Sequence, residues 1–119
     1  MLKIHKGIYV KNSDIHGWGV FTNLEIKTGE IVEECVIPYD LIPINSSVFS
    51  KYRYVWPSRK NYSHWCIALG FGSIYNHSKE KMNINWEIDE KQRIMIFTAV
   101  KDIKVGEELL FNYDSNDFY

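Results

Sequence analysis

The triplet Asn76-His77-Ser78 brings together three side chains that can bind a ligand or a reacting group. The amide and the hydroxyl donate and accept hydrogen bonds, and the imidazole can also carry a proton near neutral pH. The triplet follows an apolar run from Trp65 to Phe71, which we interpret as a buried strand flooring a cavity. His77 has two open interpretations from the residues alone, a site residue or a hydrogen-bonded structural histidine.

A second group of chemically able residues lies near the C-terminus, where Leu109-Leu110-Phe111 is followed by Asn112 and Tyr113. A tyrosine hydroxyl can orient a nucleophile or relay a proton. A tyrosine before a charged tail is also, commonly, an aromatic at the rim of a fold. We expect this segment to close the cavity that residues 67–78 floor.

Two glycines flank a large ring at Gly17-Trp18-Gly19. This arrangement lets a backbone approach a ligand closely, and it also lets a strand bend. It is not a dinucleotide-binding fingerprint, because Thr22 stands where the third glycine is required and no helical pattern follows.

Composition narrows the class of protein. The 119 residues suit a single domain, and we expect one domain over residues 1–119. The formal net charge is −1, with 14 basic and 15 acidic residues, so no global field favours nucleic acid phosphates. No apolar window is long enough to span a membrane and no N-terminal leader pattern is visible, so the sequence predicts a soluble, intracellular protein.

Other potential ligands form no convincing cluster. Cys35 and Cys66 are the only cysteines and lack the spacing of a zinc site, so both are predicted to be reduced core thiols. We expect surface or loop positions for the three other histidines, His5, His16 and His64. The pairs Glu33-Glu34 and Glu107-Glu108 are expected to form solvated edges or an acidic rim, because adjacent strand residues point to opposite faces.

The chain reads as short strands separated by turns, with at most one short helix, predicted from Val48 to about Tyr54. The most secure local prediction is a β-hairpin that pairs residues 84–88 with residues 93–98. An internal sequence similarity relates Phe21-Thr22 and Ile26–Glu30 to Phe97-Thr98 and Ile103–Glu107. In each copy the glycine is expected to take a positive φ.

Four motifs in order resemble the SET domain of protein lysine methyltransferases, and the match covers nearly the whole chain. They are Gly17-Trp18-Gly19-Val20-Phe21, Asn76-His77-Ser78, Gly106-Glu107-Glu108-Leu109 and Phe111-Asn112-Tyr113-Asp114. The chain looks most like the minimal SET proteins of large DNA viruses and some bacteria. The resemblance implies a β-clip fold of small sheets in which the C-terminal segment forms a pseudoknot beside the Asn-His-Ser segment.

The resemblance also implies a set of roles. S-adenosylmethionine would bind on one face of the pseudoknot and a lysine-containing peptide, such as a histone tail, on the other. Tyr113 would be the active-site tyrosine, Tyr54 would line the lysine channel, and Phe111 would leave room for di- or trimethylation. The residues expected at the cofactor are Gly17, Trp18, Gly19, Tyr75, Asn76, His77, Tyr113 and Phe118.

The sequence departs from the family pattern after the triplet. Many relatives have Arg-Phe-x-Asn-His-Ser-Cys-x-Pro-Asn, whereas Asn83 here arrives one residue late, behind Met82. The zinc-binding cysteines that follow the domain in many relatives are missing, so no metal is expected. Phe118 and Tyr119 could complete the lysine channel by stacking there, or a second subunit could do so, and the second alternative predicts a homodimer. The competing hypothesis is a catalytically idle SET-like module that binds a peptide.

Overall fold

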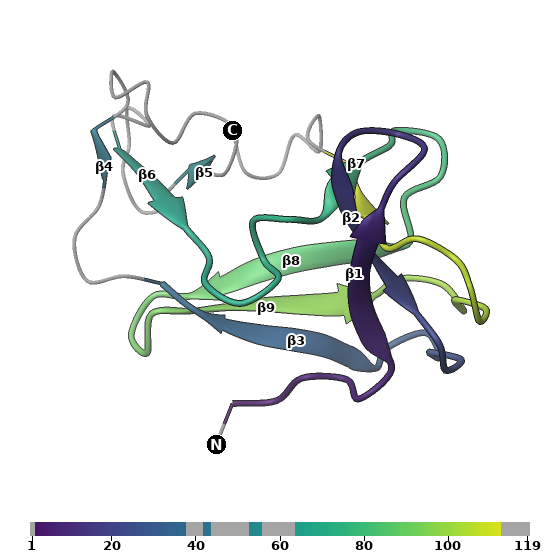
Figure 1. Cartoon of the computed structure of the whole chain (residues 1–119). Coiled ribbons are helices and arrows are strands. Elements are labelled where there is room, and N and C mark those ends of the chain that lie inside the picture. Colours follow the sequence, from purple (N-terminus) through teal and green to yellow (C-terminus); the bar gives the residue numbers. More distant parts are fainter. Residues whose placement is uncertain (1, 38–41, 44–52, 56–63, 113–119) are drawn as a thin grey trace.

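The structure is a computed structural model that describes residues 2–37, 42–43, 53–55 and 64–112. In these ranges the chain forms strands and turns and no helix (Figure 1). The strands, in chain order, are β1 (Ile8–Asn12), β2 (Trp18–Thr22), β3 (Ile31–Val36), β4 (Ile42–Pro43), β5 (Arg53–Val55), β6 (His64–Ile67), β7 (Asn76–His77), β8 (Ile84–Asp89), β9 (Ile94–Ala99) and β10 (Leu110–Phe111). The prediction of a mainly β chain in small sheets is confirmed.

The largest described sheets have three strands, in the orders β3-β9-β8 and β4-β6-β5, and two pairs, β1-β2 and β7-β10, complete the set. The hairpin of β8 and β9 is antiparallel and pairs Ile84 with Ala99 and Asp89 with Ile94. Its alternating apolar residues place Trp86 and Phe97 inside, where they form part of a continuous core. The hairpin predicted from alternation is therefore confirmed.

Strand β3 carries a β-bulge next to Val32, between the paired positions Ile31–Thr98 and Glu33–Phe97. A bulge sets two residues of one strand against one of its partner, which breaks the alternation of faces. Val32 and Glu33 are consequently both buried, at 0% and 3% exposure. The expectation that Glu33 lies on a solvated edge or acidic rim is wrong, whereas Glu34 is half-buried and its carboxylate accepts from the Lys3 backbone amide.

The two similar segments, Ile26–Glu30 and Ile103–Glu107, form matching corners that bind each other. Ile26 and Ile103 exchange two backbone hydrogen bonds, of 2.9 and 2.8 Å. Gly29 and Gly106 have φ of +90° and +89°, as expected of the glycine in each copy. Each glycine amide donates to the opposite copy, Gly29 to Ala99 and Gly106 to Thr22. The two copies therefore form a local pseudo-twofold unit that joins the ends of β2 and β9.

The parallel pair β7-β10 brings together segments 34 positions apart in sequence, with Leu110 opposite Asn76 and Phe111 opposite His77. Figure 1 shows β7 and β10 side by side at the end of the molecule where β1 and β2 lie. Parallel strands cannot be joined by a tight turn, so this contact depends on the whole intervening chain. The predicted proximity of Asn76-His77 to the C-terminal segment is confirmed through Phe111.

Two local predictions are wrong. The helix proposed through Tyr54 is not formed at residues 53–55, which are strand β5, and residues 48–52 lie outside the described residues. The apolar run from Trp65 to Phe71 is not one strand, because β6 ends at Ile67 and turns occupy residues 69–74. Gly70, with φ of +81°, supplies a conformation that most residues avoid.

Cys35 is free and only 2% exposed, as predicted for a core thiol. Burial raises the pKa of the Cys35 thiol, and the neighbouring Glu33 carboxylate raises it further. The side chain of Cys66, on β6, lies outside the described residues. Nothing within the described ranges forms a helix with the length and apolar character needed to cross a membrane.

Replacing Gly106 by alanine should lower the free energy of unfolding by about 1 kcal/mol or more, because alanine disfavours a φ of +89°. Urea denaturation measures the change. Val105→Ala is the matched control, since Val105 is 65% exposed on the same corner and should change stability by less than about 0.5 kcal/mol. Equal losses in the two variants would contradict the role given to the glycine.

Candidate functional site

The side-chain amide of Asn76 is surrounded by hydrogen-bond acceptors. Its Nδ2 lies 2.9 Å from the carbonyl oxygen of His16, 3.2 Å from that of Trp18 and 2.8 Å from Oε2 of Glu108. An amide nitrogen has only two hydrogens to donate, so three acceptors share them. The turn between β1 and β2 and the segment before β10 therefore both hold Asn76 in place.

Glu108 is the carboxylate that links these segments. Its Oε1 accepts a 2.7 Å hydrogen bond from the Ser13 hydroxyl, while Oε2 accepts from Asn76. A Cβ on Gly19 would overlap this carboxylate, so a larger residue here would require Glu108 to shift away from its present contacts. Gly17 has a positive φ of +48°, and the amide of Ser13 closes the turn by donating to the Gly17 carbonyl. The glycines around Trp18 thus serve the turn and its contact with Glu108.

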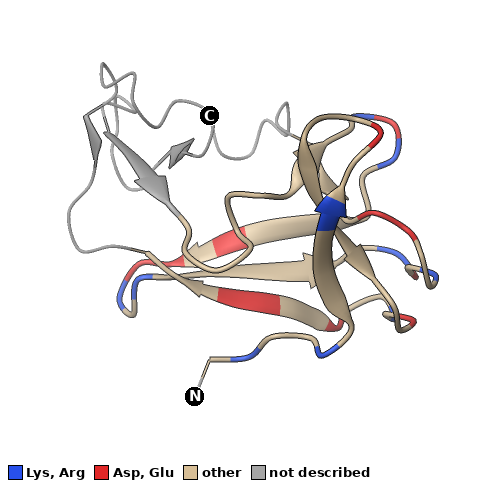
Figure 2. Cartoon of the chain, viewed as in Figure 1, with Lys and Arg blue, Asp and Glu red and all other residues tan. Residues whose placement is uncertain are grey.

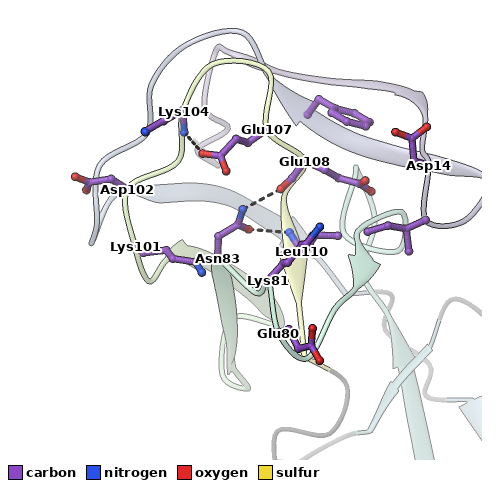
Figure 3. Close-up of a pocket in the computed structure, with 12 residues that line it drawn as sticks. Asp14, Glu80, Lys81, Asn83, Lys101, Asp102, Lys104, Glu107, Glu108 and Leu110 are labelled. Carbon is purple, nitrogen blue, oxygen red and sulfur yellow. Dashed lines mark hydrogen bonds between the residues drawn. The ribbon is translucent and has the colours of Figure 1, made fainter.

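The side chain of Asn83 holds the C-terminal segment by hydrogen bonds to its backbone. Its Nδ2 donates to the Glu108 carbonyl, and its Oδ1 accepts from the Leu110 amide, both at 2.8 Å. Its backbone amide donates to the Leu110 carbonyl and its carbonyl accepts from Val100. All four polar groups of this residue, which is 4% exposed, are therefore paired, and Figure 3 shows the two side-chain bonds. The one-residue shift of Asn83 in the motif does not prevent this contact.

His77 and Phe111 lie opposite each other across β7 and β10. Phe111 is 1% exposed and belongs to the core, and its carbonyl accepts a 2.9 Å hydrogen bond from the Ser78 amide. His77 is half-buried. The pairing keeps the backbones of the two motifs adjacent, so a ligand held by one is near the other.

Trp18 is exposed on the surface, whereas Tyr75 is buried in the core. The Trp18 side chain is 61% exposed, so its contribution to the Asn76 contact is its backbone carbonyl. Tyr75 is 3% exposed, its ring centroid lies 4.6 Å from that of Phe97, and its hydroxyl donates to Glu33. The Tyr75 side chain therefore packs inward, beneath the surface on which Asn76 makes its contacts.

Three of the predicted site residues lie wholly or in part outside the described residues. Tyr54 lies on β5, opposite Cys66 of β6, and its side chain is outside the described residues. Tyr113 and Phe118 are also outside them, although Asn112, the neighbour of Tyr113, directly follows β10. Their roles stay predictions.

The sequence predictions assigned no role in the site to three residues that hold it together, Glu108, Ser13 and Asn83. Glu108 stands within a quoted motif, Gly106-Glu107-Glu108-Leu109, and this motif was the available signal. Ser13 is 95 positions away from Glu108 and carries no motif of its own. Only the folded chain brings the two together.

A cleft of about 560 Å³ lies next to these residues and is shown in Figure 3. Its lining carries both signs of charge, with Lys81, Lys101 and Lys104 near Asp14, Glu80, Asp102 and Glu107. Figure 2 likewise shows Lys, Arg, Asp and Glu interspersed over the turns of the described chain. Among the described residues no group of three His, Cys, Asp or Glu side chains is arranged to hold a metal ion.

Comparison with protein families gives a match that covers most of the chain. The model of the SET domain matches residues 17–114, which begin at the Gly17 turn and extend past β10. The chain belongs to the SET-domain family. The four motifs that suggested this family all lie within the matched range.

Relatives of this SET domain include named histone methyltransferases. The H3 lysine-37-specific histone-lysine N-methyltransferase of Schizosaccharomyces pombe is 33% identical over 67 residues, covering 56% of this chain and 42% of that protein. The EZH2 histone-lysine N-methyltransferase of Chaetomium thermophilum is 29% identical over 123 residues, covering 84% of this chain and 8% of that protein. The matched segments span less than half of either relative.

Solved structures agree on the fold of the SET domain. A Plasmodium falciparum protein described as a candidate histone methyltransferase superimposes with a TM-score of 0.69 and 28% identity, over 92% of this chain and 95% of that one. A ctPRC2 complex with H3K27me3 and H3K27M gives a TM-score of 0.67 and 29% identity, over 93% of this chain and 15% of that chain.

Asn83→Ala should lower the free energy of unfolding by about 2–4 kcal/mol, because it leaves the buried Leu110 amide and Glu108 carbonyl without their side-chain partner. Chemical denaturation measures this loss. Asn23→Ala, at an exposed position, is the control and should cost less than about 0.5 kcal/mol. A small loss for Asn83→Ala would contradict its fastening role.

Proposed function

We propose that this SET domain is a protein-lysine N-methyltransferase that uses S-adenosylmethionine. The observation that carries the proposal is the convergence of the Gly17-Trp18-Gly19 turn, Asn76-His77 and the segment ending at Phe111 on one place. Membership of the family and the names of its relatives support the same activity.

The residues present fit the cofactor's charge. The methionine end of S-adenosylmethionine carries an ammonium group beside a carboxylate, and the sulfonium is a second positive centre. Carbonyl oxygens of His16 and Trp18, together with the Glu108 carboxylate, make an acceptor-rich place around Asn76. Each carbonyl oxygen has two lone pairs, so acceptor capacity remains after Asn76 has donated. Such a place favours a cationic donor through charge-assisted hydrogen bonds.

When bound, the cofactor would supply a methyl group on a sulfonium. A neutral lysine amine would form a bond to the methyl carbon in line with the breaking carbon–sulfur bond, and S-adenosylhomocysteine would leave. Positioning is then the main task of the protein. In water, removing the proton from a lysine amine at pH 7 costs about 4–5 kcal/mol, because the free pKa is about 10.4. We propose that Tyr113 orients the amine lone pair and that Tyr54 lines an aromatic channel that disfavours the ammonium form by desolvation.

The proposed cofactor residues are Gly17, Trp18, Gly19, Asn76 and His77, with Tyr75 beneath Asn76 and with Phe118 and Tyr113 covering the site from the C-terminal segment. The proposed substrate is a lysine on a histone tail, because the two relatives are named as histone-lysine methyltransferases. We further propose that the enzyme acts inside the cell and as a homodimer whose second subunit completes the lysine channel. Light scattering at working concentration tests the dimer.

The decisive experiment incubates the chain with labelled S-adenosylmethionine and a histone mixture, with Tyr113→Phe as the control. Lysine-linked label from the wild type, reduced at least about 100-fold in the variant, supports the proposal. Cofactor binding without label in any protein would instead favour an idle SET-like module that binds a peptide. Absence of cofactor binding would overturn both the cofactor and the reaction.

Asn76→Asp should weaken cofactor binding by about 10-fold or more. The change keeps the shape of the side chain but replaces the amide donor by a carboxylate, which repels Glu108 and the carbonyls of His16 and Trp18. Calorimetric titration with S-adenosylhomocysteine measures the affinity. Asn85→Asp, on β8, is the matched control, and an unchanged affinity in Asn76→Asp would remove Asn76 from the site.

Phe111 is expected to permit di- and trimethylation, because a phenyl ring leaves room that a tyrosine hydroxyl and its bound water would fill. Phe111→Tyr should therefore shift the product towards monomethyl-lysine. Mass spectrometry of a methylated peptide over a time course measures the product distribution. A wild-type enzyme that stops at monomethyl-lysine, with no change in the variant, would contradict the prediction.

A further inference from the structure

Glu33 is a buried carboxylate with no assigned part in the proposed reaction. It is 3% exposed, although carboxylates are rarely buried unless their oxygens are paired. Its Oε1 accepts a 2.7 Å hydrogen bond from the Tyr75 hydroxyl, and its Oε2 accepts a 2.9 Å bond from the Phe71 backbone amide. Both oxygens are therefore committed to the same short segment of chain.

That segment, residues 71–75, leads directly into Asn76-His77. Glu33 contacts its first residue through the backbone and its last residue through the side chain, so the carboxylate holds both ends. The Ile74 amide also donates to the Phe71 carbonyl at 2.9 Å, which makes the segment a closed turn. We call this arrangement the Glu33 clamp, comprising Glu33, Phe71 and Tyr75.

The surroundings leave the clamp little freedom. A Cβ on Gly70 would overlap Oε2 of Glu33, and a Cβ on Gly72 would lie 2.9 Å from Sγ of Cys35. The turn is therefore packed directly onto β3. The Tyr75 ring packs on Phe97, and Phe97 is itself paired with Glu33 across β3 and β9. Tyr75 is thus held by its ring and by its hydroxyl.

Asn76 follows Tyr75 immediately and points to the opposite side, where it meets the carbonyls of His16 and Trp18. Because successive residues of extended chain alternate in direction, fixing the Tyr75 side chain inward fixes the outward direction of Asn76. A small displacement of a ligand-binding group weakens its contacts with the ligand. Contacts that fix the direction of Asn76 therefore affect the affinity of the site for its ligand.

We propose that Glu33 is a positioning residue that sets cofactor affinity through Tyr75 and the direction of Asn76-His77. The inference rests on the proposed function for its ligand. It predicts an effect on cofactor binding with little effect on the transfer step at saturation, because the Glu33 and Tyr75 side chains are buried and bind each other.

The test uses the full chain and two single variants, Tyr75→Phe and Glu33→Gln. Each should raise the dissociation constant of S-adenosylhomocysteine, measured by calorimetry, by about 10-fold, since each disturbs a buried hydrogen bond of the clamp. The KM for S-adenosylmethionine should rise by a similar factor, while kcat and the peptide KM stay within about 2-fold. The loss of affinity in the double variant should be smaller than the product of the two single losses, because the two residues share the Tyr75–Glu33 hydrogen bond.

Tyr9→Phe and Glu34→Gln are the matched controls. Tyr9 lies on β1 with its ring near Phe21, and Glu34 is the neighbour of Glu33 bound to Lys3. Both controls should leave cofactor affinity unchanged within about 2-fold. Variants of the clamp that lose melting temperature but retain wild-type affinity would overturn the positioning role and leave a structural one.

Amide hydrogen exchange separates this inference from the proposed function. Clamp variants should show faster exchange at residues 71–78 with little change in the β8-β9 hairpin, whether or not the chain transfers a methyl group. A wild type that binds no cofactor would contradict the proposed function, and unchanged exchange at 71–78 in Tyr75→Phe would contradict the clamp by itself. Where Tyr75→Phe does not fold, Glu33→Gln provides the same measurement.

Discussion

The structure depends on the need to pair the backbone groups of segment 107–111, which is buried from Leu109 to Phe111. The Thr22 amide donates to the Glu107 carbonyl, and the Leu109 amide donates to the Val20 carbonyl. Asn83 pairs with Glu108 and Leu110, and β10 pairs with β7. An unpaired polar group in this interior would cost about as much as a lost hydrogen bond, or more. The segment therefore has one position, and that position brings Phe111 beside His77.

Two carboxylates support the site from different directions. Glu108 joins the β1-β2 turn to Asn76 through Ser13, whereas Glu33 holds the turn that precedes Asn76. Glu108 receives hydrogen bonds from two segments distant from it in sequence, and Glu33 receives them from both ends of one such segment. Partly or fully buried carboxylates are costly when their oxygens lack donors, so these contacts form together with the fold. Asn76 is consequently fixed from both sides before any ligand binds.

Pattern reasoning succeeded where the deciding contacts were local. The alternation of residues 84–98 predicted the hairpin of β8 and β9, and glycine chemistry predicted the positive φ of Gly29 and Gly106. It failed at the β3 bulge, which turned Glu33 inward, and at the run after β6, where Gly70 starts a turn. A bulge changes the faces of a strand without changing its composition, so alternation alone does not reveal it.

The sequence by itself determined the family, because the four motifs are ordered along the chain and each is a matter of residue type. It also determined that Asn76-His77 and the segment around Phe111 belong to one site. Only the tertiary structure decided how that site is held: the Ser13–Glu108–Asn76 contacts and the Glu33 clamp join residues from 32 to 95 positions apart. Such contacts depend on which polar groups lie close together once the chain is folded, and this is a property of the whole fold.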